Sequence, residues 1–502
     1  MGDPKNIFKG EKMKRILTLI LAYLLMLSVI CSCGGSGNGG IKGPVGEGAE
    51  GDYVYPNLDF KGENIVVSTL QQSAKSRDYF VKEGEDTSEP IDAAIWESNK
   101  RLEEKFNYTL VEDGFTADCA WEELWIEQSN YLIRNFISGD DVFDFIFFAL
   151  GQRPDLVTNG YLHDLSDYEA LQLDKPWWDV KLNKDITIND RLYMASGAVN
   201  LAPYQSMACI TFNKDIIANN QLDSPYDAVR DGTWTLDLLN EYAAACKNMG
   251  TDPTFWVLAG DGGTSTYGIG MHRDFPAFFL TGANIPYLTE TDGDYNFTLG
   301  ESDDFYTVFD KIQPLFTHCQ DGGVGGGDAS SSKNSIRLLF PEGRMAFCMN
   351  YVSVTYDIMR DSNVDFGFLP VPKLRVEQEN YVTPVNDHLS FICLPSTSEK
   401  PEEVALLLDA MAYDRYMNVV PVFYDSFVTY KGVRDEDSLE MLELMTDTRT
   451  MDLGIAYGWC YELVVSKLSW NVTSGAHASV IAANEGALND YIDEFINTSF
   501  AD

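Results

Sequence analysis

The sequence Asn64-Ile-Val-Val-Ser-Thr69 is a short run rich in β-branched residues, and Tyr108-Thr-Leu-Val-Glu112 is a second run of the same kind. Between them, residues 92–106 carry apolar side chains, among them Ile95 and Leu102, at helical spacing. The β-branched runs predict strands, and the helical spacing predicts an amphipathic helix. Strands that alternate with helices form βαβ units, so we expect an α/β fold with a mostly parallel sheet.

Further elements follow along the chain. We expect strands at 144–148, 206–212, 344–350, 366–369 and 389–394, and helices at 236–248 and 401–413. In a parallel sheet, ligands bind in the crevice at the carboxyl ends of the strands. Ligand contacts are therefore expected in the loops at 70–73 and 149–154. The Gly- and Ser-rich stretch 322–332 predicts a loop and not a domain boundary.

Composition limits the possible partners. The chain has 502 residues, of which 45% are hydrophobic, with 36 Lys and Arg against 77 Asp and Glu, a formal net charge of −41. At roughly 100–200 residues per domain, this length predicts two or three units that each bury a core. An acidic surface repels phosphate backbones, so nucleic acid is not an expected partner.

The N-terminus has the character of a targeting segment. Lys14 and Arg15 precede an apolar run at 16–30 that is shorter than the roughly 20 residues needed to span a bilayer. The pair Ser32-Cys33 ends this run and resembles a bacterial lipobox, in which a small residue precedes a lipidated cysteine.

We therefore expect a lipoprotein signal peptide over residues 1–33 and lipidation of Cys33. Cys31 fits this pattern less well, because the bulky Ile30 precedes it. A transmembrane anchor or an ordinary cleaved signal remains the alternative. Residues 34–52 are rich in glycine and predict a flexible tether.

The remaining cysteines do not predict a disulfide framework. They are odd in number, scattered and without C-x-x-C spacing: Cys119, Cys209, Cys246, Cys319, Cys348, Cys393 and Cys460. Most lie in apolar runs, where a thiol behaves as a small hydrophobic group. We expect these cysteines to be buried and reduced.

Four sequence signatures follow one another along the chain: Pro176-Trp-Trp-Asp179 with Leu192-Tyr193; Phe212-Asn-Lys214; Gly232-Thr-Trp-Thr-Leu-Asp237; and Phe340-Pro-Glu-Gly-Arg-Met-Ala346 with Phe366-Gly-Phe-Leu-Pro-Val-Pro372. Their order resembles family 1 of the extracellular solute-binding proteins of ABC importers, the group that includes maltodextrin-binding protein. The residues within these signatures are similar to those of a lipoprotein branch of the family found in anaerobic Gram-positive bacteria. The resemblance covers nearly everything from Gly62 to the C-terminus.

The resemblance implies a two-lobed periplasmic-binding-protein-like fold of type II, with a mostly parallel sheet in each lobe and crossing hinge strands between them. By this analogy, lobe 1 comprises 53–200 plus 345–383, and lobe 2 comprises 201–344 plus 384–502. Crossings are expected near 198–206, 340–344 and 384–390. Ligand favours the closed form only by contacting both lobes, so binding residues must come from both.

The resemblance also implies partners and location. We expect a small-molecule carbohydrate as ligand, ABC permease subunits as protein partner, and a monomer held at the extracellular face of the cell membrane by its lipid anchor only. No cofactor is expected. Related chains often carry a calcium-like loop before a Tyr-Gly pair, but 260–266 holds one carboxylate before Tyr267-Gly268, so no metal is assigned.

A sugar site needs aromatic faces for stacking and paired polar groups for the hydroxyls. The chain has 28 Phe, 26 Tyr and 9 Trp. Candidate ligand-binding residues lie after expected strands, on the crossings or among the lobe 2 aromatics: Gln71, Gln72, Phe148, Gln152, Arg153, Tyr204, Gln205, Trp256, Tyr267, Asn350, Tyr351, Asn386, Asp387 and Trp459. Core packing is the competing role for Trp256 and Trp459.

No catalytic residues are assigned. Neither G-x-S-x-G, H-E-x-x-H nor a Walker sequence occurs, and the histidines are isolated. We therefore expect a binding protein and not an enzyme. A peptide or other small-solute receptor or adhesin, and a secreted carbohydrate-active hydrolase, are the alternatives.

Overall fold

The computed structural model of the chain describes residues 53–70, 89–119, 121–149, 155–253, 262–271, 274–318, 336–386, 389–429 and 435–500. All of them belong to one compact unit, Lys42–Asp502. The expected signal peptide, the tether and Cys33 lie outside the described residues, as do Gln71, Gln72, Gln152, Arg153, Trp256 and Asp387. Among the described helices, none combines the length and apolar character that crossing a bilayer requires.

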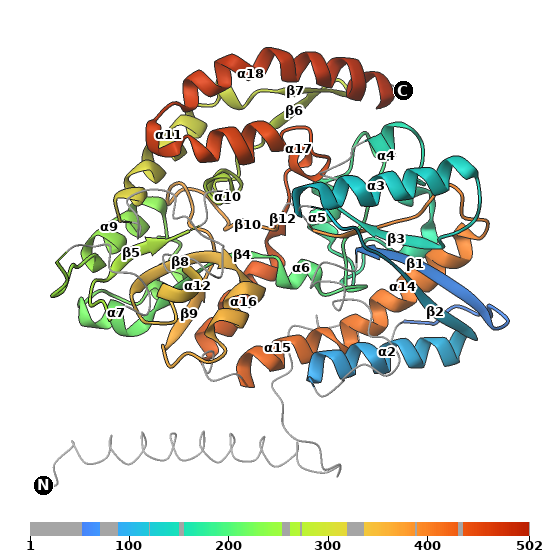
Figure 1. The fold of residues 1–502 in the computed structure, drawn as a ribbon, viewed down its shortest axis with the longest axis horizontal. Helices are drawn as coiled ribbons and strands as arrows, with labels where there is room; N and C mark the ends of the chain where they lie inside the picture. The colour runs from blue at the N-terminus through green and yellow to red at the C-terminus, as the bar shows by residue number, and fades with distance from the viewer. Residues whose placement is uncertain are drawn as a thin grey trace, which may run out of the picture. The chain divides into compact units, whose positions relative to one another are not determined.

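The first sheet contains the predicted βαβ unit. Its strand order is β11-β3-β1-β2, with the bounds Glu63–Leu70 (β1), Tyr108–Phe115 (β2), Phe145–Phe148 (β3) and Phe391–Cys393 (β11). β1 runs parallel to β2 and β3, while β11 runs antiparallel to β3. Helices α2 (Pro90–Phe106) and α3 (Trp121–Ser138) make the two crossovers and lie on opposite sides of the sheet (Figure 1). The expectation of a mostly parallel sheet is confirmed here.

The second sheet is mixed. Its order is β5-β8-β4-β9, with the bounds Ala208–Asn213 (β4), Tyr267–Gly270 (β5), Met345–Tyr351 (β8) and Phe366–Leu369 (β9). β4 runs antiparallel to both β8 and β9, and only β5 with β8 is parallel. The expectation of a mostly parallel sheet in each lobe is therefore wrong for the second sheet. β4 begins at the edge of the sheet where β8 ends, so these two neighbouring strands run in opposite directions.

Sheet pairing also corrects the expected allocation of segments. β8 and β9 pair with β4, so residues 345–369 belong with the second sheet and not with the first. β11 pairs with β3, and α14 (Pro401–Asn418) contacts α2, so this part of 384–502 belongs with the first sheet. The crossing expected near 340–344 is wrong, because β5 and β8, the strands before and after these residues, lie in the same sheet. β8 is buried at six of its seven positions, so no alternation marks the sheet to which it belongs.

Two shorter strand pairs complete the topology, namely the hairpin β6 (Leu288–Thr291) with β7 (Asp294–Phe297), and β10 (Thr383–Pro384) with β12 (Arg449–Thr450). The outer edge of β7 is covered by two side-chain amides. Asn497 accepts from the Tyr295 N–H at 2.8 Å and Asn489 accepts from the Phe297 N–H at 2.8 Å, while each amide nitrogen donates to the carbonyl of the same residue. These contacts protect an edge strand that could otherwise pair with another chain.

Helices surround the two sheets. The remaining α-helices are α4 (Asp155–Thr158), α5 (Val180–Asp185), α6 (Ala202–Gln205), α7 (Lys214–Asn219), α8 (Pro225–Arg230), α9 (Leu236–Cys246), α10 (Pro276–Gly282), α11 (Asp303–Ile312), α12 (Ile336–Leu339), α13 (Val352–Met359), α15 (Val420–Thr429), α16 (Glu436–Asp447), α17 (Leu453–Ala456), α18 (His477–Tyr491) and α19 (Thr498–Phe500). A π-helix, η8, spans Glu462–Leu468. Figure 1 shows α18 running beside the β6–β7 hairpin.

One buried carboxylate organises the core around the first sheet. Asp409 of α14 is 1% exposed and accepts hydrogen bonds from Trp177 Nε1 (2.8 Å), Trp178 Nε1 (2.9 Å), Gln172 Nε2 (2.7 Å) and the Tyr53 hydroxyl (3.0 Å). Burial raises the pKa of Asp409, and the four donors oppose that rise. The network ties the first described residue and the Pro-Trp-Trp signature to α14.

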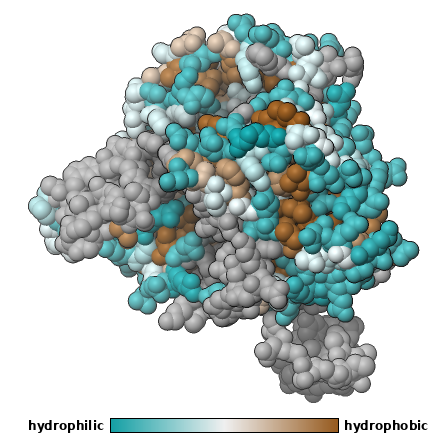
Figure 2. Space-filling model, turned by 45° about the vertical axis from the view of Figure 1, so that its right-hand side comes forward, coloured by the Kyte–Doolittle hydropathy of each residue, from teal (hydrophilic) through white to brown (hydrophobic). Residues whose placement is uncertain are grey.

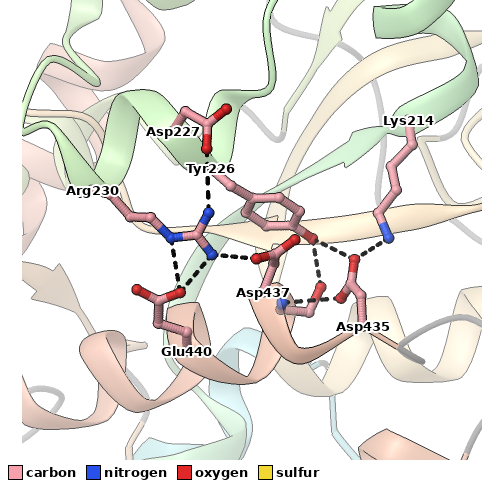
Figure 3. A network of polar contacts seen from close by, with 8 residues as sticks. Lys214, Tyr226, Asp227, Arg230, Asp435, Asp437 and Glu440 are labelled. Carbon is pink, nitrogen blue, oxygen red and sulfur yellow. Dashed lines mark hydrogen bonds and ion pairs between the residues drawn. The ribbon is translucent and has the colours of Figure 1, made fainter. Parts of the chain in front are cut away.

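Ion pairs on the surface are more exposed to solvent than the buried Asp409 network. Hydrophilic side chains cover much of the face in Figure 2. In Figure 3, Arg230 of α8 reaches Asp437 and Glu440 of α16, while Lys214 reaches Asp435. The Arg230 pairs are solvent-exposed, so water and salt screen most of their attraction.

The expectation of buried, reduced cysteines is confirmed for five of the six described side chains and is wrong for Cys119, which is only partly buried. Cys209, Cys246, Cys348, Cys393 and Cys460 are buried free thiols. Cys119 is free and half-buried, and Cys319 lies outside the described residues. Burial raises the pKa of Cys209 and Cys393, which keeps these thiols protonated and unreactive.

Asp452 sits at the start of α17 and holds two segments together. Its carboxylate accepts from the Gly454 N–H at 2.8 Å and from the Tyr287 N–H at 3.0 Å. Burial raises the pKa of Asp452 to about 6, although these donors oppose the rise and Asp185 adds a nearby negative charge. The ionised form therefore costs stability above pH 6.

Replacing Asp409 by Asn should lower the free energy of unfolding by about 2–4 kcal/mol, because an amide cannot accept all four buried donors. Urea titration followed by circular dichroism measures the change. Asp437→Asn is the matched control at the exposed Arg230 pair and should lower the free energy of unfolding far less than Asp409→Asn does. Equal effects of the two substitutions would contradict the role given to Asp409.

Replacing Asp452 by Asn should remove a pH dependence. The folded-state pKa lies above the unfolded value, so this carboxyl destabilises the fold fully above pH 6 and ceases to do so as pH falls toward 4. Relative to the Asn variant, the wild-type chain should gain about 2 kcal/mol between pH 7.5 and pH 4.5. Urea titrations at the two pH values test this, and a constant difference would refute it.

Candidate ligand-binding site

Two crossing segments connect the sheets and run beside each other. At one end, Ala195 and Ile392 exchange backbone hydrogen bonds of 2.9 Å, and at the other the Asn386 N–H donates to the Ser206 carbonyl at 2.9 Å. Between these ends, Asn200 Nδ2 donates to the Ser390 carbonyl at 3.3 Å. The expected crossings near 198–206 and 384–390 therefore coincide with passages of the chain between the sheets.

A buried ion pair fixes the crossing region. Arg449 of β12 contacts the carboxylate of Asp179, which also accepts from Ser196 Oγ at 2.5 Å. The Arg449 guanidinium carbon lies 4.2 Å from the centre of the Tyr204 ring, and both charged side chains are less than 8% exposed. Sequence reasoning missed Arg449, since a single Arg in a polar stretch carries no distinguishing signal.

Several predicted residues meet where the crossing segments reach the second sheet. Tyr351, the last residue of β8, lies opposite Ala208, the first residue of β4, and Asn386 is bonded to Ser206 two residues earlier. Gln205 is half-buried at the end of α6. The backbones of Gln205, Asn386 and the pair Asn350-Tyr351 thus lie close together, although these three segments are far apart in sequence.

The polar groups of this edge are only partly satisfied. Asn350 is 1% exposed, its Oδ1 accepts from the Tyr351 N–H at 2.9 Å, and its Nδ2 has no hydrogen-bond partner among the described residues. A buried amide donor without a partner is costly, and a hydroxyl-bearing ligand is one way to satisfy it. Tyr351 is half-buried and edge-on to Phe275 and Phe278, at ring-centre distances of 5.1 and 5.9 Å.

Other predicted residues pack in the core. Tyr204 is 3% exposed and wedged against Phe423 and Tyr424, and burial raises its pKa well above the usual value. Phe148 is fully buried at the carboxyl end of β3, opposite Phe391. These aromatic rings support the crossing region and the first sheet without offering an exposed face.

Tyr267 and Trp459 are also enclosed. Trp459 is 6% exposed and stacks on Tyr457 with ring centres 5.2 Å apart, and its Nε1 has no partner among the described residues. Tyr267 is 2% exposed at the start of β5, and its ring lies 5.7 Å from the guanidinium of Arg344. In this conformation, core packing accounts for both side chains.

Thr264 and Ser265, just before Tyr267-Gly268, are held by the side chains of Asp252 and Arg344. Asp252 accepts from the Thr264 and Ser265 N–H groups, and Arg344 Nε donates to the Ser265 carbonyl at 3.1 Å. Although burial opposes it, these donors lower the pKa of Asp252. Within the described ranges, no group of three or more His, Cys, Asp or Glu side chains is placed to hold a metal ion.

A cavity of about 370 Å³ opens where α5, α10, the β6–β7 hairpin and β12 meet. Its polar lining includes Lys181, Asp185, Glu290 and Asp452. None of the predicted ligand-binding residues lines it, and Asp185 is already engaged with Lys181 and the Thr450 hydroxyl. This cavity is therefore separate from the edge that gathers Asn350, Tyr351 and Asn386.

Solved structures with the same fold place this arrangement in a known architecture. A cyclo/maltodextrin-binding protein complexed with maltotetraose matches with TM-score 0.56 at 14% identity, over 87% of this chain and 98% of that one. The GacH receptor of Streptomyces glaucescens, solved without ligand and with acarbose, matches with TM-score 0.53 at 15% identity, over 86% and 99%. An ABC substrate-binding protein of Listeria monocytogenes in complex with cycloalternan gives 0.52 at 13%, over 86% and 99%.

These likenesses establish the two-lobed type II binding-protein fold. No curated protein matches the sequence. The family model described as bacterial extracellular solute-binding protein matches residues 132–417, which is more than half of the chain. The chain therefore belongs to the bacterial extracellular solute-binding protein family of ABC transporters.

Proposed function

We propose that this protein is a lipid-anchored, non-enzymatic receptor that captures a mono- or oligosaccharide between its two lobes. The receptor acts as a monomer at the extracellular face of the membrane and delivers the bound sugar to an ABC permease. The observation that carries the proposal is the meeting of Gln205, Asn350, Tyr351 and Asn386 at the edge where both crossing segments enter the second sheet. Their amide and hydroxyl groups match the donors and acceptors of a sugar.

The structural neighbours support the same ligand class. Those named above were solved with maltotetraose, acarbose and cycloalternan. The hinge supports a capture mechanism, because paired crossing segments let two lobes rotate while their ends stay in register. A ligand that contacts both lobes stabilises the closed form by its differential affinity for that form.

A panel of maltotetraose, other glycans, amino acids, peptides and polyamines tests the ligand class by thermal shift. A sugar present at 100 times its dissociation constant should stabilise the protein by about 2.7 kcal/mol. Asn386→Ala should weaken maltotetraose binding by roughly 5- to 30-fold in calorimetry, the loss of one or two hydrogen bonds.

Asn220→Ala, at an exposed helix end, is the matched control and should leave the affinity unchanged. Stabilisation by a peptide and by no sugar would assign the protein to a different ligand class. Release of product from a glycan during incubation would make it a hydrolase.

Replacing Cys33 by Ala should release the full-length protein from the membrane fraction, because the substitution removes the lipidated thiol. Immunoblotting of membrane and soluble fractions measures the distribution. Cys31→Ala is the control and should stay with the membrane. Retention of the Cys33→Ala protein would refute the lipobox interpretation.

A further inference from the structure

Trp470 combines an exposed indole with a fixed orientation. Its side chain is 47% exposed, and its Nε1 donates to Asp274 Oδ1 at 2.6 Å. The Ser469 hydroxyl also donates to the Asp274 carbonyl, at 3.4 Å. An indole that is already oriented loses little conformational entropy when a ligand stacks on it.

The surroundings of Trp470 connect it to the candidate site. Asp274 directly precedes Phe275, whose ring is edge-on to Tyr351 at 5.1 Å. Tyr351 ends β8 opposite the start of β4, which is the edge where the crossing segments enter. Trp470 is therefore linked to Tyr351 by one hydrogen bond, one peptide bond and one ring contact.

The other tryptophans whose side chains are described are less suited to stacking. Trp459 is 6% exposed and covered by Tyr457, while Trp177, Trp178 and Trp234 are buried. Trp96 is half-buried on α2, with Lys100 Nζ 4.5 Å from its ring centre. Among these side chains, Trp470 exposes the largest fraction of its surface.

We propose that Trp470, oriented by Asp274, is an aromatic platform on the second-sheet side of the ligand site that stacks on the C–H face of a sugar ring. The inference rests on the proposed function and adds a specificity-determining pair that the sequence did not mark. Sugars whose rings present an unbroken C–H face should benefit most from this platform.

Calorimetry with maltotetraose, or with the panel sugar that stabilises the wild-type protein most, tests the platform. Trp470→Ala should weaken binding roughly 5- to 100-fold, and Trp470→Phe should retain most of the affinity. Asp274→Ala should weaken binding by a smaller factor, because the indole loses its fixed orientation. Without ligand, the melting temperature of Trp470→Phe should equal that of the wild type.

Trp96→Ala is the matched control and should bind as the wild type does. If the wild type binds a sugar and Trp470→Ala binds it equally well, the platform is refuted while the proposed function stands. If the wild type binds no sugar on the panel, the proposed function fails, and the platform fails with it. Loss of affinity in Trp96→Ala as large as in Trp470→Ala would also overturn the assignment, since it would reflect general instability.

Discussion

The buried pair between Asp179 and Arg449 is the constraint on which the crossing region depends. Asp179 ends the Pro-Trp-Trp-Asp signature beside the first sheet, whereas Arg449 lies on β12, which pairs with the strand that leads into the second crossing. Removing one partner would leave an uncompensated buried charge, typically at a cost of about 3–5 kcal/mol. Because the two charges offset each other and the guanidinium packs on the Tyr204 ring, the pair joins the segment after the Pro-Trp-Trp signature to β12 at the crossing.

The fixed crossings determine which side chains meet. Asn386 is bonded to the backbone of Ser206, and β4, which starts at Ala208, meets the end of β8 at Tyr351. The candidate site is thus assembled by register and not by any contiguous motif. A one-residue slip of β8 against β4 would turn Asn350 to the opposite face and replace it with an apolar neighbour.

The sequence predicted local structure well, because local periodicity decides it. β1, α2 and β2 appear at the expected residues, and 198–206 and 384–390 are the expected crossings. Sheet membership could not be predicted for β8 and β9, since both are buried almost throughout and carry no alternation. Nor could the sequence distinguish the buried Trp459 from the exposed Trp470, because a tryptophan's exposure depends on distant partners such as Tyr457 and Asp274.

The charge distribution bears on the kind of ligand that suits this site. The chain carries a formal net charge of −41, yet the four residues gathered at the crossing edge, Gln205, Asn350, Tyr351 and Asn386, are all uncharged. A field of that sign disfavours anionic solutes and leaves a neutral polyol unaffected. An uncharged site binds through hydrogen bonds and stacking, whose strength depends little on salt, in contrast to a site built on ion pairs. The neutral residues at this edge therefore suit the uncharged sugar proposed as ligand better than they suit an anionic solute.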